Sequence, residues 1–251
     1  MKARYEFKYL ITDEQMAVVR DIASTFMDPD PYAPDGIYSV YSLYFDSREY
    51  YCAQATLEGL RKRFKLRVRT YGFKKHFPVF VEEKGRVGTS IVKRRALIDR
   101  AHVNTFCLGD AKPVEGWGTR SEKDAVTVER FRDLADGLRM QPTLWVGYKR
   151  EPWVSPYGDG SRLTFDMQLK VQPPRSDEPF KPRKNAWELV PLEQPTILEM
   201  KFNGASPAWM QKIIHHLQLD RVSVSKYTLG AVQCMDQPWS RPQWSTAWMP
   251  F

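Results

Sequence analysis

The sequence has few cysteines, and their spacing does not pair them. Cys52, Cys107 and Cys234 are the three cysteines among 251 residues, and they stand far apart along the chain. They form neither a CxxC motif nor a disulfide framework. Isolated cysteines of this kind are typical of a reducing compartment, so we expect a cytoplasmic protein.

Long apolar runs are also missing. The start of the chain, "MKARYEFKYLI", has no hydrophobic region of a secretory signal. No stretch approaches the roughly 20 consecutive apolar residues that a transmembrane helix needs. We therefore expect a soluble protein, which would reach a membrane only through a separate membrane-protein partner.

The familiar phosphate-binding and nucleophile motifs are absent as well. The sequence contains no GxxxxGK[ST] loop, no protein-kinase signature and no Ser/His/Asp set. An enzyme that acts on phosphate compounds would therefore need a different cradle for the anion.

Positive charge, by contrast, is abundant. Lysine and arginine number 38 against 30 acidic residues, which gives a net charge of +8 and a pI near 9.3. This balance favours an anionic partner, whether nucleic acid, nucleotide, polyphosphate or membrane surface, without choosing among them. The chain shows no internal repeat, and we expect a single domain over residues 1–235 followed by a Trp/Pro-rich tail, 236–251.

The stretch "KLRVRTY", residues 65 to 71, shows where the charge is concentrated. Lys65, Arg67 and Arg69 alternate with Leu66 and Val68. Successive side chains of a strand point to opposite faces, so three cations share one face and the apolar residues share the other.

The same alternation recurs in most of the predicted strands. We expect strands at 3–11, 37–47, 61–72, 78–86, 89–98, 142–155, 161–171 and 196–202. Helices are predicted at 12–24, 50–60 and 206–219, with Thr12 and Ser206 as N-caps, and residues 101–140 combine helix and loop. Segments 28–36 and 172–195 are rich in proline and are predicted to be loops.

The charged faces carry more bases than acids. Twelve basic residues lie on these faces: Arg4, Lys8, Lys65, Arg67, Arg69, Lys84, Lys93, Arg95, Arg150, Arg162, Lys201 and Lys226. Four acidic residues accompany them: Glu6, Glu82, Asp166 and Glu199.

Two architectures are compatible with this pattern. An ordinary antiparallel sheet with one solvated face also alternates in this way. Like charges side by side in a sheet repel, however, so a dense basic face favours a bound anion. Arginine, which dominates the strongest strand, suits phosphate. An α+β fold explains both features: an antiparallel β-barrel tunnel with a charged lumen, helices packed on the outside, and carboxylates that hold a divalent metal.

Eight short motifs, in order, carry a family resemblance. They are "RYEFKYLI", "KLRVRTYG", "VFVEEKGR", "VKRR", "YKREPW", "SRLTFD", "ILEMKF" and "SKYTLG". Together they resemble the VTC (vacuolar transporter chaperone) domain, the polyphosphate polymerase branch of the triphosphate tunnel metalloenzymes. The resemblance covers residues 3 to about 232.

The resemblance implies an activity and a set of tunnel residues. Catalytic members transfer the γ-phosphate of ATP to a growing inorganic polyphosphate chain with Mn²⁺ or Mg²⁺. The implied catalytic residues are Lys8, Arg67, Arg69, Lys84, Lys93, Arg150, Arg162 and Lys226, with Tyr148 beside them as a substrate-binding residue and Glu199 as the metal ligand.

Further candidates follow from their shared face. Lys65, Arg95 and Lys201 are expected to bind substrate. Glu6 and Glu82 are either additional metal ligands or acids that orient the basic lining by ion pairing. The assignment of Lys93 depends on register, because Arg94 and Arg95 follow it directly and a one-residue slip exchanges the faces.

Three other functions compete with the polymerase. A triphosphatase or nucleotide cyclase of the same fold would share the tunnel, and a non-catalytic polyphosphate-binding module would keep the lining without turnover. A nucleic-acid binder is disfavoured, because such proteins expose aromatic residues beside basic ones, whereas here the two fall mostly on opposite faces of the strands.

Overall fold

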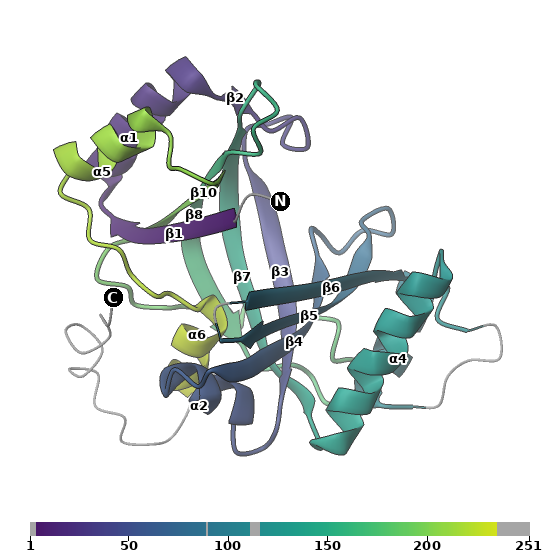
Figure 1. Cartoon of the computed structure of the whole chain (residues 1–251). Helices are drawn as coiled ribbons and strands as arrows, with labels where there is room; N and C mark the ends of the chain where they lie inside the picture. The colour runs from purple at the N-terminus through teal and green to yellow at the C-terminus, as the bar shows by residue number, and fades with distance from the viewer. Residues whose placement is uncertain (1–3, 89, 111–115, 235–251) are drawn as a thin grey trace.

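The computed structural model describes residues 4–88, 90–110 and 116–234, and an antiparallel sheet dominates it (Figure 1). Eight long strands form the sheet: β1 (Arg4–Ile11), β3 (Tyr38–Asp46), β4 (Lys62–Thr70), β5 (Val79–Val87), β6 (Ser90–Ile98), β7 (Gln141–Val154), β8 (Arg162–Gln172) and β10 (Thr196–Asn203). Their order across the sheet is β1-β10-β8-β7-β3-β4-β5-β6.

The sheet is strongly curved, with β1 and β6 at the two ends of its hydrogen-bonded order. Five strands separate β1 from β5 in the sheet. The sheet nevertheless curls enough for Lys84 of β5 to help lower the pKa of Glu6 on β1. The structure is therefore a half-barrel whose charged face is concave. The predicted α+β fold class, an antiparallel barrel-like sheet with a charged lumen and helices packed outside, is confirmed, with the sheet curled into a half-barrel in which β1 and β6 stand at opposite ends of the strand order.

Helices cover the convex face in two places. The helices α1 (Asp13–Phe26) and α5 (Ala208–His216) lie over β1, β10 and β8, where Val19 and Ile213 pack with Phe165 and Leu198 in one buried cluster. The helix α4 (Glu122–Gly137) lies beside β5 and β6, and α3 (Val103–Leu108), preceded by a 3-10 turn at Arg100–His102, contacts β7. Apolar residues of one parity along each strand form these contacts.

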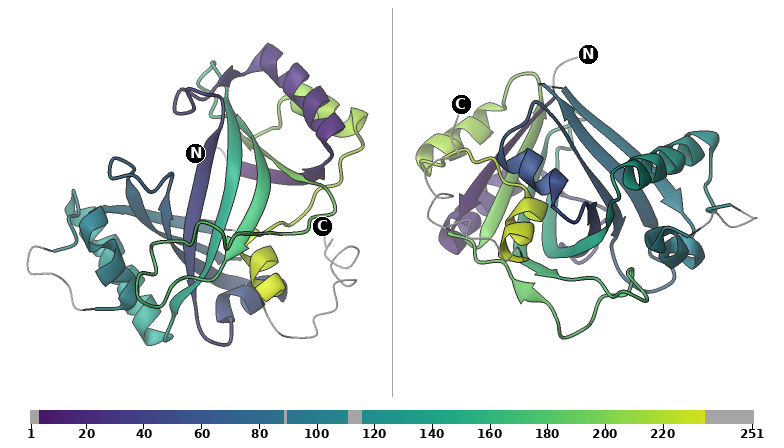
Figure 2. Two further views of the ribbon diagram at one scale, coloured as in Figure 1. Left: turned by 180° about the vertical axis from the view of Figure 1, so that it is seen from behind. Right: turned by 90° about the horizontal axis from the view of Figure 1, so that it is seen from below.

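Two short helices lie at one end of the half-barrel. These are α2 (Tyr51–Leu57) and α6 (Lys226–Cys234), and the view from below shows them across the interior of the sheet (Figure 2). They contact each other as well as β4 and β7. The end formed by α2 and α6 is called the floor below.

Sequence reasoning located most of the elements, with four differences. One is α6, which was not predicted: Lys226, expected on a charged strand face, is the first residue of this helix. Thr12 caps α1 as predicted, in a capping box with Gln15. The prediction that Ser206 caps α5 is wrong. Pro207 is the N-cap, because its extended ψ of 140° lies outside the helical range, so the helix begins only at Ala208. Two-residue strands also lie within predicted loops: β2 (Asp28–Pro29) pairs with β7, and β9 (Glu188–Leu189) pairs with β8.

Candidate functional site

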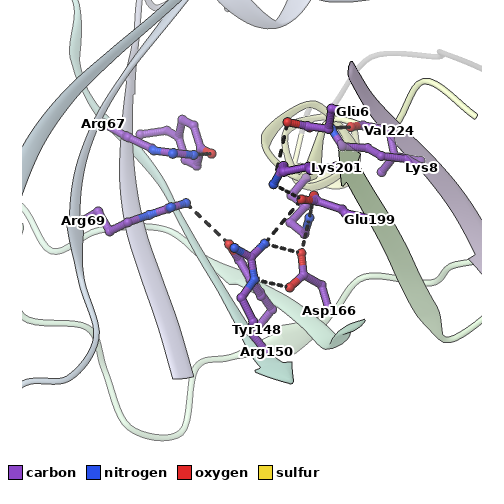
Figure 3. A network of polar contacts seen from close by, with 12 residues as sticks. Glu6, Lys8, Arg67, Arg69, Tyr148, Arg150, Asp166, Glu199, Lys201 and Val224 are labelled. Carbon is purple, nitrogen blue, oxygen red and sulfur yellow. Dashed lines mark hydrogen bonds and ion pairs between the residues drawn. The ribbon is translucent and has the colours of Figure 1, made fainter. Parts of the chain in front are cut away.

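Strand register places the predicted lining on the concave face. Arg67 of β4 lies opposite Glu82 of β5, and Glu82 lies opposite Arg95 of β6. On the other wall, Glu199 of β10 lies opposite Lys8 of β1. Side chains directly opposite in an antiparallel pair share a face. Figure 3 shows the two walls pointing their charged groups toward each other.

A buried ion cluster centred on Glu199 and Asp166 occupies one wall. The Lys226 ammonium lies 2.6 Å from Asp166 Oδ2 and donates to Glu199 Oε1 at 2.9 Å. Arg150 donates twice to Asp166, from Nε at 2.6 Å and from Nη2 at 2.7 Å. Lys201 donates to the remaining Glu199 oxygen at 2.9 Å. Both carboxylates are therefore held between cations, which locks their position without a metal ion.

The charge states of this cluster follow from its packing. Burial disfavours the ionised carboxylates, but nearby cations outweigh that penalty. For Glu199, the ammonium of Lys226 makes the largest such contribution, and its pKa falls well below the usual range. Arg150 contributes most to the lowered pKa of Asp166. Burial also opposes the charge on Lys226, yet its pKa is raised because Asp166 and Glu199 surround it.

Glu6 extends the cluster toward β1. Its Oε1 lies 2.8 Å from Lys8 Nζ, and Lys8 also donates to the Val224 carbonyl at 3.3 Å. Burial would raise the pKa of Glu6, but the ammonium groups around it lower the pKa to about 2. Lys201 Nζ lies 2.9 Å from Glu199 Oε2 and 3.7 Å from Glu6 Oε2, so one cation already bridges these two carboxylates.

The bridged position fits a divalent metal. Magnesium-like ions bind through one or two carboxylates and take their other ligands from substrate phosphates and water. Glu199 and Glu6 provide two such carboxylates at a place where the fold already accepts a cation. Over residues 4–88, 90–110 and 116–234, no group of three or more His, Cys, Asp or Glu side chains is arranged to hold a metal ion. The protein alone would therefore supply only part of the coordination sphere.

The opposite wall centres on Glu82, which is fully buried. Arg67 donates to Glu82 Oε2 at 2.6 Å and to the Tyr44 hydroxyl at 2.8 Å. Arg95 Nε lies 3.0 Å and Lys93 Nζ 3.8 Å from the other carboxylate oxygen. Burial opposes its charge, but Arg67 and the neighbouring cations lower the pKa of Glu82.

Glu82 thus forms ion pairs with basic residues of β4 and β6. Its recorded ion pairs, among the described residues, are with β4 and β6 and not with the Glu199 cluster. The register also settles the "VKRR" run. Lys93 and Arg95 face the interior, whereas Arg94 pairs with Glu83 at 3.2 Å on the convex side.

Two predicted arginines occupy different settings. Arg69 is buried, donates from Nε to Ser42 Oγ at 3.0 Å, and reaches the Tyr148 hydroxyl at 3.5 Å. Arg162 lies at the end of its strand and donates to Asp30 at 2.5 Å, with a side chain that is 45% exposed. The structure therefore brings Arg69 into the interior and leaves Arg162 at its rim.

The floor helix α6 is anchored by a contact that sequence reasoning missed. The Tyr227 hydroxyl donates to Asp46 Oδ2 at 2.6 Å, and the backbone N–H groups of Ser47, Cys52 and Ala53 donate to the same carboxylate. The Tyr227 ring also stacks on Tyr44 at 4.6 Å. No local sequence signal marked it, because Asp46 ends β3 and lies four residues before Tyr50, the N-cap of α2. Its partner lies 181 positions away.

In the part of the chain that the structure describes, no helix is long and apolar enough to cross a membrane. No curated protein matches the sequence. A protein from Pyrococcus horikoshii OT3 is 15% identical with a TM-score of 0.46, covering 92% of this chain and 96% of its own. A candidate adenylate cyclase from Bacillus halodurans is 11% identical with a TM-score of 0.48, covering 89% and 94%.

A family model gives the decisive match. The model described as the VTC domain matches residues 3–235, which is nearly the whole chain. The ordered motifs from "RYEFKYLI" to "SKYTLG" lie within that span. The chain belongs to the VTC domain family.

Proposed function

We propose that this protein is an ATP-dependent inorganic polyphosphate polymerase that works inside the half-barrel. The observation that carries the proposal is the pair of facing cationic walls, one around Glu82 and one around Glu199. Figure 3 shows Arg67 and Arg69 of the first wall opposite the Glu199 cluster of the second. VTC family membership supports a polyphosphate-related function. The finer assignment, transfer from ATP to a polymer end, is our inference.

The reaction needs positioning more than covalent help. A terminal oxygen of the polyphosphate chain attacks the γ-phosphorus of ATP and forms the new P–O bond. The bond from that phosphorus to the β-bridging oxygen breaks, and ADP leaves with the electron pair. No protein nucleophile is required, because fixed cations that neutralise the phosphoryl oxygens provide the main stabilisation.

Each wall supplies its own set of cations for binding phosphate oxygens. Arg67 and Arg69, held by Glu82 and Ser42, present planar donor groups suited to phosphate oxygens. Lys226 and Arg150 come from the opposite side, already fixed by Asp166. A polyphosphate chain between the walls would be contacted by both sets of cations. These contacts would hold its terminal oxygen in line with the γ-phosphorus and the leaving oxygen of ATP.

A divalent metal is part of the proposal. Its residues would be Glu199 and Glu6, which Lys201 now bridges. Bound there with the nucleotide, Mg²⁺ or Mn²⁺ would supply charge neutralisation on the β- and γ-phosphates. The product assay below compares the two metals.

The test is a product assay with matched variants. Purified protein is incubated with ATP and either Mn²⁺ or Mg²⁺, and long-chain polyphosphate, ADP and free phosphate are measured. The variants are Arg67→Ala and Glu199→Gln, with Lys123→Met on the exposed side of α4 as control. We expect polymer and ADP from wild type and control, and loss of at least about a hundredfold in both site variants.

Other outcomes would assign a different function. Free phosphate or pyrophosphate without polymer would indicate a triphosphatase or cyclase of the same fold. Polyphosphate binding without turnover of ATP, with either metal, would leave a binding module and refute the polymerase.

A further inference from the structure

Two lysines of the interior differ from the other lysines described above. Lys65 of β4 lies directly opposite Lys84 of β5. Among the residues that the structure describes, neither of them forms a salt bridge, whereas Lys8, Lys201 and Lys226 each contact a carboxylate. Two ammonium groups that face each other repel, and they cost stability until an anion separates them. Glu6 and Glu199 act on Lys84 from beyond ion-pair distance and so offset this repulsion only in part.

The Lys65 ammonium is held in place by the floor helix α2. Its Nζ donates to Thr56 Oγ1 at 2.7 Å, and the Thr56 hydroxyl in turn donates to the Cys52 carbonyl at 2.9 Å. The hydroxyl hydrogen of Thr56 is therefore donated within α2, and the hydroxyl oxygen accepts from Lys65. An ammonium has three N–H donors, so Lys65 keeps two and Lys84 keeps three for a ligand.

Among the described residues, the main electrostatic neighbours of Lys65 are cations. Burial is the largest cause that lowers its pKa, to about 7, and Lys84 on β5 is the next. Arg63 on its own strand and Lys8 on β1 act in the same direction. The one acidic group that faces it is the Cys52 thiol on α2, and burial raises the pKa of that thiol so that it stays neutral.

We propose that Lys65 and Lys84 form a subsite for a doubly charged terminal phosphate group, with Thr56 as the residue that positions Lys65. A terminal phosphate carries about −1.5 to −2 charge at neutral pH, and a phosphate within a chain carries less. Two adjacent ammonium groups match the terminal group better. The subsite depends on the proposed function only for the identity of the molecule that carries this phosphate. That molecule is a polyphosphate end, pyrophosphate or ATP with its γ-phosphate.

Proton uptake gives this subsite a measurable signature. A bound dianion beside Lys65 favours the ammonium form, so the amine takes up a proton where it was partly neutral. With a pKa of about 7, roughly half a proton is taken up at pH 7. Uptake grows toward pH 8 and disappears toward pH 6. Arginine at the same position is always charged and takes up none.

Calorimetric titration with pyrophosphate tests the subsite. Binding heats in two buffers of different ionisation enthalpy give the protons taken up by wild type, Lys65→Arg, Lys65→Met and the control Lys123→Met. We expect wild type to take up about half a proton more than Lys65→Arg at pH 7. We expect Lys65→Met to bind at least about tenfold more weakly, because a charge-assisted contact is lost, and Lys123→Met to match wild type.

Thr56→Val tests the positioning role. The variant keeps both lysines but loses the acceptor that holds Lys65 and favours its charged form, so weaker binding with proton uptake at least as large as in wild type is expected. Equal uptake by wild type and Lys65→Arg, or wild-type affinity in a folded Lys65→Met, would overturn the subsite. A parallel titration with ATP distinguishes the sources: a difference confined to pyrophosphate assigns the subsite to the product or primer end, and one confined to ATP assigns it to the nucleotide.

This result is separable from the polymerase assay. Pyrophosphate binding with proton uptake, in a protein that makes no polymer, would keep the subsite and remove the proposed activity. Polymer formation with no role for Lys65 would do the reverse.

Discussion

Replacement of Lys226 by methionine tests the central ion cluster most directly. The Lys226 ammonium contacts Asp166 at 2.6 Å and Glu199 at 2.9 Å, and all three groups are largely buried. Methionine preserves most of the side-chain volume and removes the charge. Two buried carboxylates are then left close together with fewer cations.

The size of the effect follows from what remains. Breaking a buried ion pair by removal of one partner costs about 3–5 kcal/mol. Here Arg150 still forms its two hydrogen bonds to Asp166, and Lys201 still contacts Glu199. Because neither carboxylate is left without a cation, we expect the lower end of the range, a loss of about 3 kcal/mol at pH 7.

The pH dependence gives an independent check on the cause. In wild type, the pKa values of Asp166 and Glu199 are lowered by their cations. Their stabilisation is therefore present above their unfolded pKa values and is lost as the pH falls through the folded ones. The variant has less of this stabilisation to lose. Its deficit relative to wild type should shrink below about pH 4.

Urea unfolding of both proteins between pH 3 and 8 measures this difference. Lys123→Met on exposed α4 is the matched control for loss of one positive charge. A deficit below about 1 kcal/mol at pH 7, or a deficit that grows toward acid, would refute the reasoning.

Two further predictions concern the floor helix α6 and the carboxylate of Glu6. In Gly230→Ala, the new methyl group meets Val171 and displaces α6, so we expect a loss of about 1–3 kcal/mol in urea unfolding. The helical control Gly137→Ala has open space around it and should be neutral or slightly stabilised; equal losses in the two variants would contradict this account. The lowered pKa of Glu6, about 2, means that its stabilisation is lost as the pH falls from about 4.5 to 2. Glu6→Gln should flatten the stability profile in that window alone, and an unchanged slope there would exclude the ion pairing.

Much of the fold was predictable because strands have a strict two-residue period. The parity of "KLRVRTY" placed Arg67 and Arg69 on one face with Lys65, and the structure confirms that face as concave. The same rule located Glu82 and Glu199. Periodicity did not require the sheet to curve, and that expectation came from the repulsion between like charges and from the family resemblance.

The partners of these residues were less accessible to sequence reasoning. Asp30 holds Arg162 at the rim, and Asp46 holds Tyr227 at the floor, each across more than a hundred positions. Such pairs depend on tertiary packing that no local pattern encodes. The functional roles of the lining residues stay predictions until the product assay is done.

The pairing of β1 with β10 has a consequence for how the chain folds. Arg4 is opposite Asn203, so the first strand made during synthesis has its neighbour in the sheet almost 200 positions later. Contacts between residues distant in sequence form slowly, because a long loop must close first. The Glu199 cluster contains residues from β1, β10 and α6, and it can therefore assemble only when the C-terminal part of the domain has left the ribosome. Until then β1 lacks its neighbour in the sheet. Folding of this protein is thus a late event in its synthesis, and the interior becomes electrostatically complete in its last step.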